Sequence, residues 1–322
     1  MTTSPLLTSR PRAGTIRAKS ARDPYRPGTL REAVAEVSRR ALASGALVPI
    51  PTAGEHLDDG GVRFSVRVLA ALARKDEERK ERAREAAAGK PANPFLPYEE
   101  RLLVADVSAG HVALLNKFNV VDRHLLIVTR AFEDQRALLT PEDFAAWWRC
   151  LAEYPALGFY NGGVEAGASQ PHKHLQLVPL PLAPGGSPVP VEPLLAAAGR
   201  GGVGVVPGFD FLHAFERLGL ANAPAEEAAG EACERYRALL AAVGIREVGA
   251  GGARMQSGPY CLLGTREWLL VVPRSREFFG PVSVNSLGYA GSFFVRDAAQ
   301  LRLLREAGPL AVLRETALPA RR

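Results

Sequence analysis

The stretch that most constrains this chain is "GASQPHKHLQLVPLP", residues 167–181, which places two histidines two positions apart. The chain of 322 residues has six histidines in all. Polar and apolar residues alternate here as a β-strand with one polar face requires. In such a strand His172, His174 and Gln176 project from one face, and the residues between them project from the other. The two histidine backbones would lie about 6.5 to 7 Å apart, so both imidazoles can reach one ligand.

The loop before this strand is rich in small residues. Its sequence, "NGGVEAGASQ" over residues 161–170, supplies glycines that let backbone N–H groups approach an anion, and a hydroxyl donor in Ser169. A phosphate beside a histidine is the simplest ligand that uses both features. A neutral imidazole is also a nucleophile toward phosphorus, and its ordinary pKa near 6.5 leaves much of it neutral at pH 7. The pattern therefore favours phosphoryl or nucleotidyl transfer through a histidine.

Two other interpretations of the histidine pair stay open on the residues alone. In the first, both histidines are packed or surface residues and the glycines form a plain turn. In the second, they bind zinc, and a third ligand has to come from His111, His124 or His213. The three cysteines form no CxxC pair, so neither a cysteine zinc site nor a disulfide framework is indicated.

Four segments of the chain resemble the histidine-triad superfamily in its transferase branch, and more specifically the ATP adenylyltransferase, or diadenosine tetraphosphate phosphorylase, family. The segments are "NPFLPYEERLLVADVSAGHVALLNKFNVVDRHLLIVTRAFEDQ", "NGGVEAGASQPHKHLQLVPLP", "VVPGFDFLHAFERLG" and "WLLVVPRSREFFGPVSVNSLGYAGSFFVRD". The His-x-His-x-Gln triplet gains its specificity from these segments standing in this order. The resemblance extends from about residue 75 to the C-terminus.

This resemblance implies roles for individual residues. It makes His174 the nucleophile that accepts AMP, His172 a residue that orients it or contacts phosphate, and Gln176 a ligand of the phosphate oxygens. An amide cannot shuttle a proton as a third histidine can, so the glutamine favours transfer over hydrolysis. The other residues assigned to the nucleotide and phosphate site are Lys75, Asn116, Asn161, Gly167, Ser169, Gln170, Asn285 and Ser286.

The implied reaction is the reversible phosphorolysis of diadenosine tetraphosphate to ADP and ATP through an AMP-histidine intermediate, with inorganic phosphate as acceptor. No covalent cofactor is expected, and magnesium would accompany the polyphosphate. The alternatives are a hexose-1-phosphate nucleotidylyltransferase and a non-catalytic sensor of dinucleotide polyphosphates. The missing CxxC and "HKH" in place of "HPH" argue against the first, and the intact His174 and Gln176 argue against the second. Nucleoside preference and direction in the cell have no signature in the sequence.

The order of predicted elements favours an α+β fold, because strands gather in two groups instead of alternating with helices. The resemblance supplies its geometry, an antiparallel sheet flanked by helices. "TLRE", residues 29–32, has the form of a capping box at the first helix. We expect a flexible basic tail over residues 1–25 and a single histidine-triad-like domain over 26–322. Helices are predicted at 30–42, 140–153, 225–243 and 297–307, and strands at 62–68, 102–107, 111–115, 125–129, 260–263 and 268–272.

The charge of the chain suits an anionic ligand. The net charge is +6, but the charged residues, 23% of the chain, are spread along it and form no stripe for nucleic acid. Arg274 and Arg276 in "VPRSRE" either clamp phosphate or are surface charge. No apolar run reaches the length of a membrane span, and no secretory core is seen, so we expect a cytoplasmic protein without membrane contact. A monomer is expected.

Overall fold

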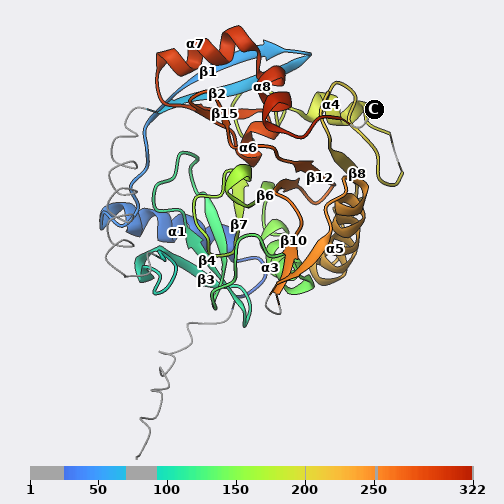
Figure 1. Ribbon diagram of the computed structural model, residues 1–322. Coiled ribbons are helices and arrows are strands. Elements are labelled where there is room, and N and C mark those ends of the chain that lie inside the picture. Colours follow the sequence, from blue (N-terminus) through green and yellow to red (C-terminus); the bar gives the residue numbers. More distant parts are fainter. Residues whose placement is uncertain (1–24, 70–92, 200, 251–252, 321–322) are drawn as a thin grey trace, which may run out of the picture.

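The structure, a computed structural model, describes residues 25–69, 93–199, 201–250 and 253–320 (Figure 1). Its centre is an eight-stranded sheet in the order β3-β4-β5-β7-β6-β11-β12-β8, in which every neighbouring pair is antiparallel. This confirms the predicted α+β fold with an antiparallel sheet. The strands are β3 (Leu103–Asp106), β4 (His111–Leu115), β5 (Leu125–Thr129), β6 (Ala156–Gly162), β7 (His174–Pro179), β8 (Ala214–Arg217), β11 (Tyr260–Gly264) and β12 (Trp268–Pro273).

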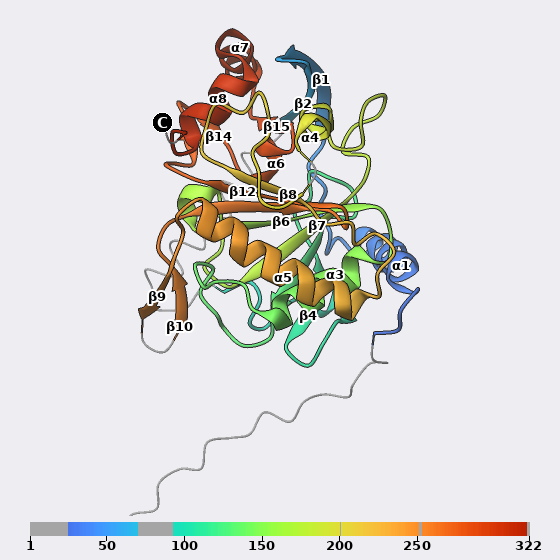
Figure 2. The same cartoon turned by 90° about the vertical axis from the view of Figure 1, so that its right-hand side faces the viewer.

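Helices cover one face of this sheet (Figure 2). They are α1 (Leu30–Ala43), α3 (Pro141–Leu151) and α5 (Ala225–Ala242), and their apolar sides share one buried cluster with the sheet. Trp147 and Trp148 of α3 are fully buried in it, so they serve packing. A Cβ on Gly158 of β6 would lie 2.2 Å from Trp147 Nε1, so only a glycine lets α3 approach the sheet this closely.

A second, smaller layer covers the opposite face (Figures 1 and 2). It holds a three-stranded sheet in the order β1-β2-β15, in which β15 runs parallel to β2. Phe64 of β2 and Phe293 of β15 join Phe159 of β6 in a second buried cluster. The elements of this layer are β1 (Thr52–Asp59), β2 (Val62–Leu69), α4 (Glu192–Ala197), α6 (Ser286–Tyr289), β15 (Ser292–Val295), α7 (Ala298–Ala307) and α8 (Pro309–Thr316).

Short elements complete the described part of the chain. The 3₁₀ turns are η1 (Glu100–Leu102) and η2 (Val164–Ala166), and two small ribbons are formed by β9 (Glu247–Ala250) with β10 (Ala253–Gln256) and by β13 (Phe278–Phe279) with β14 (Val282–Ser283). None of the helices in the described ranges is long and apolar enough to cross a membrane.

The first helix begins where predicted, but its capping box is not formed. The Thr29 side chain makes no cap hydrogen bond in α1, while the carboxylate of Glu153 accepts from the N–H of Leu30 at 3.1 Å. A distant carboxylate therefore satisfies one of the unpaired N–H donors at the helix start, and the predicted Thr29 cap is absent. At α3 the box is present, with Thr140 and Asp143 bonded reciprocally.

Candidate active site

The predicted alternation of the histidine stretch is confirmed, with one correction to the strand. The Phe95 ring lies 5.5 Å from the ring of His172 and 5.4 Å from that of His174, measured between centroids, so both imidazoles lie on one side. Lys173 points the other way, to Asp143 of α3. However, β7 begins only at His174, and the first histidine precedes the ladder in an isolated bridge.

His174 is held in one tautomer. Its Nδ1 lies 2.8 Å from the carbonyl oxygen of His172. A carbonyl oxygen only accepts, so Nδ1 carries the hydrogen and Nε2 keeps its lone pair. Within the described residues Nε2 has no hydrogen-bonding partner. Burial lowers the pKa of His174 to about 4, so the ring is neutral at pH 7. The arrangement presents a neutral nitrogen nucleophile.

His172 uses both of its ring nitrogens within the protein. Its Nε2 donates to the carbonyl oxygen of Thr129 at 2.8 Å, and its Nδ1 lies 2.9 Å from the amide nitrogen of Asn93, which donates to it. Burial lowers the pKa of this ring as well, which favours the neutral form that these bonds need. Of the two roles implied for His172, the geometry favours orienting the nucleophile, because the ring is occupied and the carbonyl holds His174.

A relay of side chains orients Gln176. His124 Nε2 donates to Gln176 Oε1 at 2.9 Å, and Asn116 Nδ2 donates to His124 Nδ1 at 3.2 Å. The carbonyl end of the Gln176 amide is therefore occupied by the protein. Its NH₂ end has no partner in the described ranges, so it can donate to an anion. Asn116, predicted in the nucleotide pocket, lies two steps behind Gln176 in this relay.

Asn161, at the end of β6, is oriented in a similar way. Its Oδ1 accepts from the backbone N–H of Ser286 at 3.0 Å and lies 2.6 Å from Ser286 Oγ. Its NH₂ group has no hydrogen-bonding partner among the described residues. Ser286 is fully buried and also contacts the Tyr160 carbonyl oxygen, so its hydroxyl serves the protein. A direct contact of Ser286 with a ligand stays a prediction.

The glycine loop after β6 lies against the start of α6. Gly167 has φ of +90°, and a Cβ there would lie 2.6 Å from the Cβ of Asn285. Only glycine combines that backbone conformation with so close a neighbour. The Asn285 side chain accepts from the N–H of Leu287 at 3.0 Å, which makes it the N-cap of α6. The fold thus brings together Gly167 and Asn285, which are far apart in the sequence.

Arg274 connects the glycine loop with the segment before α6. Its buried guanidinium donates to the carbonyl oxygens of Ala166 at 3.4 Å and Val284 at 2.8 Å. Its hydrogen bonds are made to protein groups, so it stiffens the loop and does not clamp phosphate through them. Arg276 is exposed and pairs with Glu315 at 3.0 Å.

The remaining predicted site residues are Ser169, Gln170 and Lys75. Ser169 is exposed and Gln170 half-buried, both in the connection between η2 and β7. Their side chains make no hydrogen bonds to residues in the described ranges, so both are available to a ligand. Lys75 lies outside the described residues. Its role stays a prediction.

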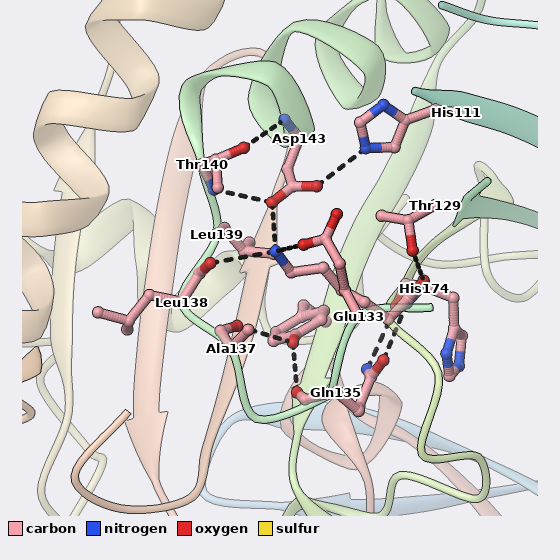
Figure 3. A network of polar contacts seen from close by, with 12 residues as sticks. His111, Thr129, Glu133, Gln135, Ala137, Leu138, Leu139, Thr140, Asp143 and His174 are labelled. Atoms are coloured by element: carbon pink, nitrogen blue, oxygen red, sulfur yellow. Dashed lines mark hydrogen bonds and ion pairs between the residues drawn. The ribbon is translucent and has the colours of Figure 1, made fainter. Parts of the chain in front are cut away.

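A buried ionic network lies behind the histidines, on the helix side of β7 (Figure 3). Lys173 Nζ donates to Asp143 Oδ2 at 2.7 Å, Glu133 Oε2 at 2.9 Å and the Leu138 carbonyl oxygen at 3.2 Å. Asp143 also accepts from His111 Nε2 at 2.9 Å. Burial alone would raise the pKa of Asp143, but the His111 hydrogen bond and the Lys173 charge outweigh it and lower that pKa. The carboxylate therefore stays charged.

The three histidines offered for the zinc interpretation have protein partners. His111 binds Asp143, His124 binds Gln176, and His213 Nε2 accepts from the N–H of Val206 at 2.7 Å. Within the described ranges, no three His, Cys, Asp or Glu side chains gather as a metal site would need.

Comparison with known proteins decides the family. The Ap4A phosphorylase N-terminal domain family matches residues 20–197, and the ATP adenylyltransferase C-terminal domain family matches residues 207–319. Diadenosine 5',5'''-P1,P4-tetraphosphate phosphorylase 2 of Saccharomyces cerevisiae is 31% identical over 245 residues, which are 67% of this chain and 73% of that protein. The chain belongs to the Ap4A phosphorylase family. The chain is therefore a nucleotidyltransferase, as the resemblance implied.

Other members of the Ap4A phosphorylase family agree. Protein APA1 of Saccharomyces cerevisiae is 28% identical over 231 residues, 64% of this chain and 69% of that protein. The crystal structure of yeast Ap4A phosphorylase Apa2 matches with a TM-score of 0.71 and 25% identity, covering 90% of this chain and 94% of that one. The crystal structure of Apa2 in complex with Ap4A matches with a TM-score of 0.69 and 26% identity, covering 91% of this chain and 98% of that one.

The two family matches meet in one sheet and one site. Strands β3 to β7 come from the first matched segment, and β8, β11 and β12 come from the second. Asn161 and Ser286, which contact each other, also come from different segments. The candidate active site therefore needs both parts of the chain.

Proposed function

We propose that this protein catalyses the phosphorolysis of diadenosine tetraphosphate (Ap4A) to ADP and ATP. Family membership supports the reaction class, and a yeast relative with 31% identity carries this activity in its name. The single observation that supports the chemistry best is His174, whose Nδ1–H is committed to a carbonyl while its Nε2 lone pair is free within the described residues.

In the first step, Nε2 of His174 attacks the α-phosphorus of Ap4A. The P–N bond forms as the bond from that phosphorus to the bridging oxygen breaks, and ATP leaves with the electron pair. The ring becomes positively charged as the bond forms. The Nδ1–H···O=C bond to His172 stabilises that charge, and no proton has to leave the ring.

In the second step, an oxygen of inorganic phosphate attacks the phosphorus of the AMP-histidine. The P–N bond breaks, its electrons return to Nε2, and ADP leaves. The acceptor is already an anion, so the enzyme needs no group to deprotonate it. Gln176, which has no titratable proton to shuttle, fits this step better than a histidine would.

Two oriented amides support the transition state in this proposal. The NH₂ groups of Gln176 and Asn161 would donate to phosphoryl oxygens, because His124 and Ser286 occupy their carbonyl ends. Donors fixed before the reaction stabilise developing charge without reorganisation. The backbone N–H groups of the glycine loop and the side chains of Ser169 and Gln170 would hold the rest of the polyphosphate.

Magnesium enters this proposal only as a counterion of the polyphosphate. The oxygens of the polyphosphate would hold the ion. We propose a monomer that acts in the cytoplasm on free nucleotides.

The test follows Ap4A by anion-exchange chromatography, with and without inorganic phosphate, for the wild type and for His174→Ala. We expect ADP and ATP in equal amounts only when phosphate is present, and no product from the variant. A radiolabelled adenylate bound to the wild-type protein after brief exposure to Ap4A would support the covalent step.

Other products would favour the alternatives. AMP formed without phosphate indicates a hydrolase, tight Ap4A binding without turnover indicates a sensor, and turnover only with a hexose 1-phosphate indicates the sugar transferase. Each of these results rejects phosphorolysis.

A further inference from the structure

Gln135 fills a break in the ladder between β6 and β7, beside the nucleophile. The two strands pair as far as Phe159 opposite Gln176, and there the ladder stops. If it continued, Asn161 and His174 would face each other two residues further along. The side chain of Gln135 lies at that position instead.

The carboxamide of Gln135 takes the hydrogen bonds that a paired strand would supply (Figure 3). Its Oε1 accepts from the backbone N–H of His174 at 2.8 Å, and its Nε2 donates to the His174 carbonyl oxygen at 3.3 Å. The same Nε2 donates to the Asn161 carbonyl oxygen at 3.0 Å. A carboxamide has the donor and acceptor of a peptide group, so it satisfies His174 while it holds the two strands apart.

Gln135 is itself fixed on all sides. Its backbone N–H donates to the Pro171 carbonyl oxygen at 2.8 Å, and its own carbonyl oxygen accepts from the Tyr160 hydroxyl. The residue is 2% exposed, so water cannot replace these partners. A rigid amide therefore sets the position of the nucleophile's backbone.

We infer that Gln135 is a positioning residue for His174, an inference that rests on the proposed function. It fixes the backbone from which the imidazole extends, and it keeps the end of β6 at a distance from that imidazole. The Nδ1–H bond to the His172 carbonyl depends on the same short backbone segment. A shift of about 1 Å in a reacting group can cost about 10²-fold in rate, so a residue of this kind acts mainly on kcat.

The test compares Gln135→Met with Gln300→Met as a matched control. Gln300 of α7 is also buried, accepts from the N–H of Arg296 at 2.9 Å and donates to the Pro281 carbonyl oxygen at 3.1 Å. Both variants lose a buried amide and should lower Tm to a similar degree. We expect Gln135→Met to lower kcat for Ap4A phosphorolysis about 30- to 100-fold with KM nearly unchanged, and Gln300→Met to leave kcat within about twofold.

A second variant, Gln135→Glu, gives a readout that a purely structural role would not move. The protonated acid keeps an acceptor and one donor hydrogen, one fewer than the amide, while the carboxylate has no donor. Burial raises the pKa of a carboxyl group, so kcat of this variant should rise as the pH falls, whereas the wild type shows no such gain. If Gln135→Met does not fold, Gln135→Glu serves as the test variant.

Three results overturn the inference: equal kcat values in Gln135→Met and Gln300→Met, a loss confined to KM, or a Gln135→Glu profile parallel to that of the wild type. If the wild type leaves Ap4A untouched, the proposed function fails. The role of Gln135 is then tested separately, by the rate at which diethyl pyrocarbonate acylates His174, measured by mass spectrometry. We expect Gln135→Met to change that rate and Gln300→Met to leave it unchanged. Equal rates in both variants overturn the inference.

Discussion

The two faces of β7 differ in how their polar groups are used, although both are buried. On the helix face, Lys173 directs its ammonium to three acceptors, and Asp143 accepts from the lysine and from His111. On the opposite face, His174 and Gln176 each have one end bound by the protein and the other end without a partner among the described residues. The polar groups on the helix face thus have hydrogen-bonding partners in the protein, whereas His174 and Gln176 use only one end of each side chain in this way.

This difference distinguishes a structural network of hydrogen bonds from a candidate active site. Burial and charge alone would select Lys173 and Asp143 as readily as the histidines, because all are buried. A buried polar group without a partner is costly, so two such groups on one strand face, beside the glycine loop, favour a ligand there. The predictions below test this comparison, starting with the largest expected effect.

Replacing His174 by alanine should remove nearly all activity. The substitution deletes the proposed nucleophile, so we expect the rate of Ap4A phosphorolysis to fall at least about 10⁴-fold, measured by product chromatography. His213→Ala is the matched control, because His213 is also buried and bound to a backbone N–H, but in another part of the fold. Comparable activity loss in both variants would contradict the role of His174.

His174→Ala should also change how stability depends on pH. The folded-state pKa of about 4 lies below the ordinary 6.5, so the unfolded chain binds the proton more readily. The contribution of His174 to the free energy of unfolding is therefore fully present above about pH 6.5 and is lost as the pH falls toward 4. Urea unfolding at several pH values should show a shallower loss in the variant, and an unchanged slope would argue against the lowered pKa.

Replacing Lys173 by methionine should act mainly on stability. The change leaves the buried Asp143 carboxylate without its cation. The free energy of unfolding, measured with urea, should therefore fall by about 3 to 5 kcal/mol. The double variant Lys173→Met/Asp143→Leu should recover only part of this loss, because it removes the unpaired buried charge but leaves His111 Nε2 and the Thr140 N–H without their acceptor. A large loss of kcat in a Lys173→Met protein of normal stability would mean that the two faces are not separate in function.

Replacing Gln176 by alanine should lower kcat more than it weakens binding. The variant loses one donor to the phosphoryl oxygens, an effect of about 10²- to 10³-fold on kcat by analogy with oxyanion-hole donors. The free energy of unfolding should fall by about 1 to 3 kcal/mol, because the buried His124 Nε2 loses its acceptor, Gln176 Oε1. Steady-state kinetics checks this, and a change in KM alone would mean that Gln176 contributes equally to ground state and transition state.

Replacing His124 by phenylalanine should have a smaller effect of the same kind. Gln176 Oε1 then loses its donor, and the amide can turn away from the phosphoryl oxygens. The loss of one orienting hydrogen bond corresponds to about a tenfold decrease in kcat. In the double variant His124→Phe/Gln176→Ala the two losses should not add, and additive losses would show that His124 acts by another route.

The sequence by itself determined the pattern of the site and much of the fold. Alternation along residues 172–177 separated the two faces of β7, and continuous apolar runs located β4 and β5. The segment "TPED", residues 140–143, with a proline at the first helical position and acids in the first turn, located the start of α3. These features rest on periodicity and on contacts between residues a few positions apart, which a sequence shows directly.

The tertiary structure decided which nitrogen of His174 carries its hydrogen, which end of each amide is free, and that Gln135 stands between two strands. No local pattern marks these features, because they depend on the path of the backbone and on donors and acceptors that arrive from distant parts of the chain. The acceptor for His174 is the carbonyl oxygen of His172, two residues away, and the partner of Asn161 lies 125 residues away. The Glu153 carboxylate likewise replaced the cap predicted at Thr29, since hydrogen bonds form with whichever group the fold brings within reach.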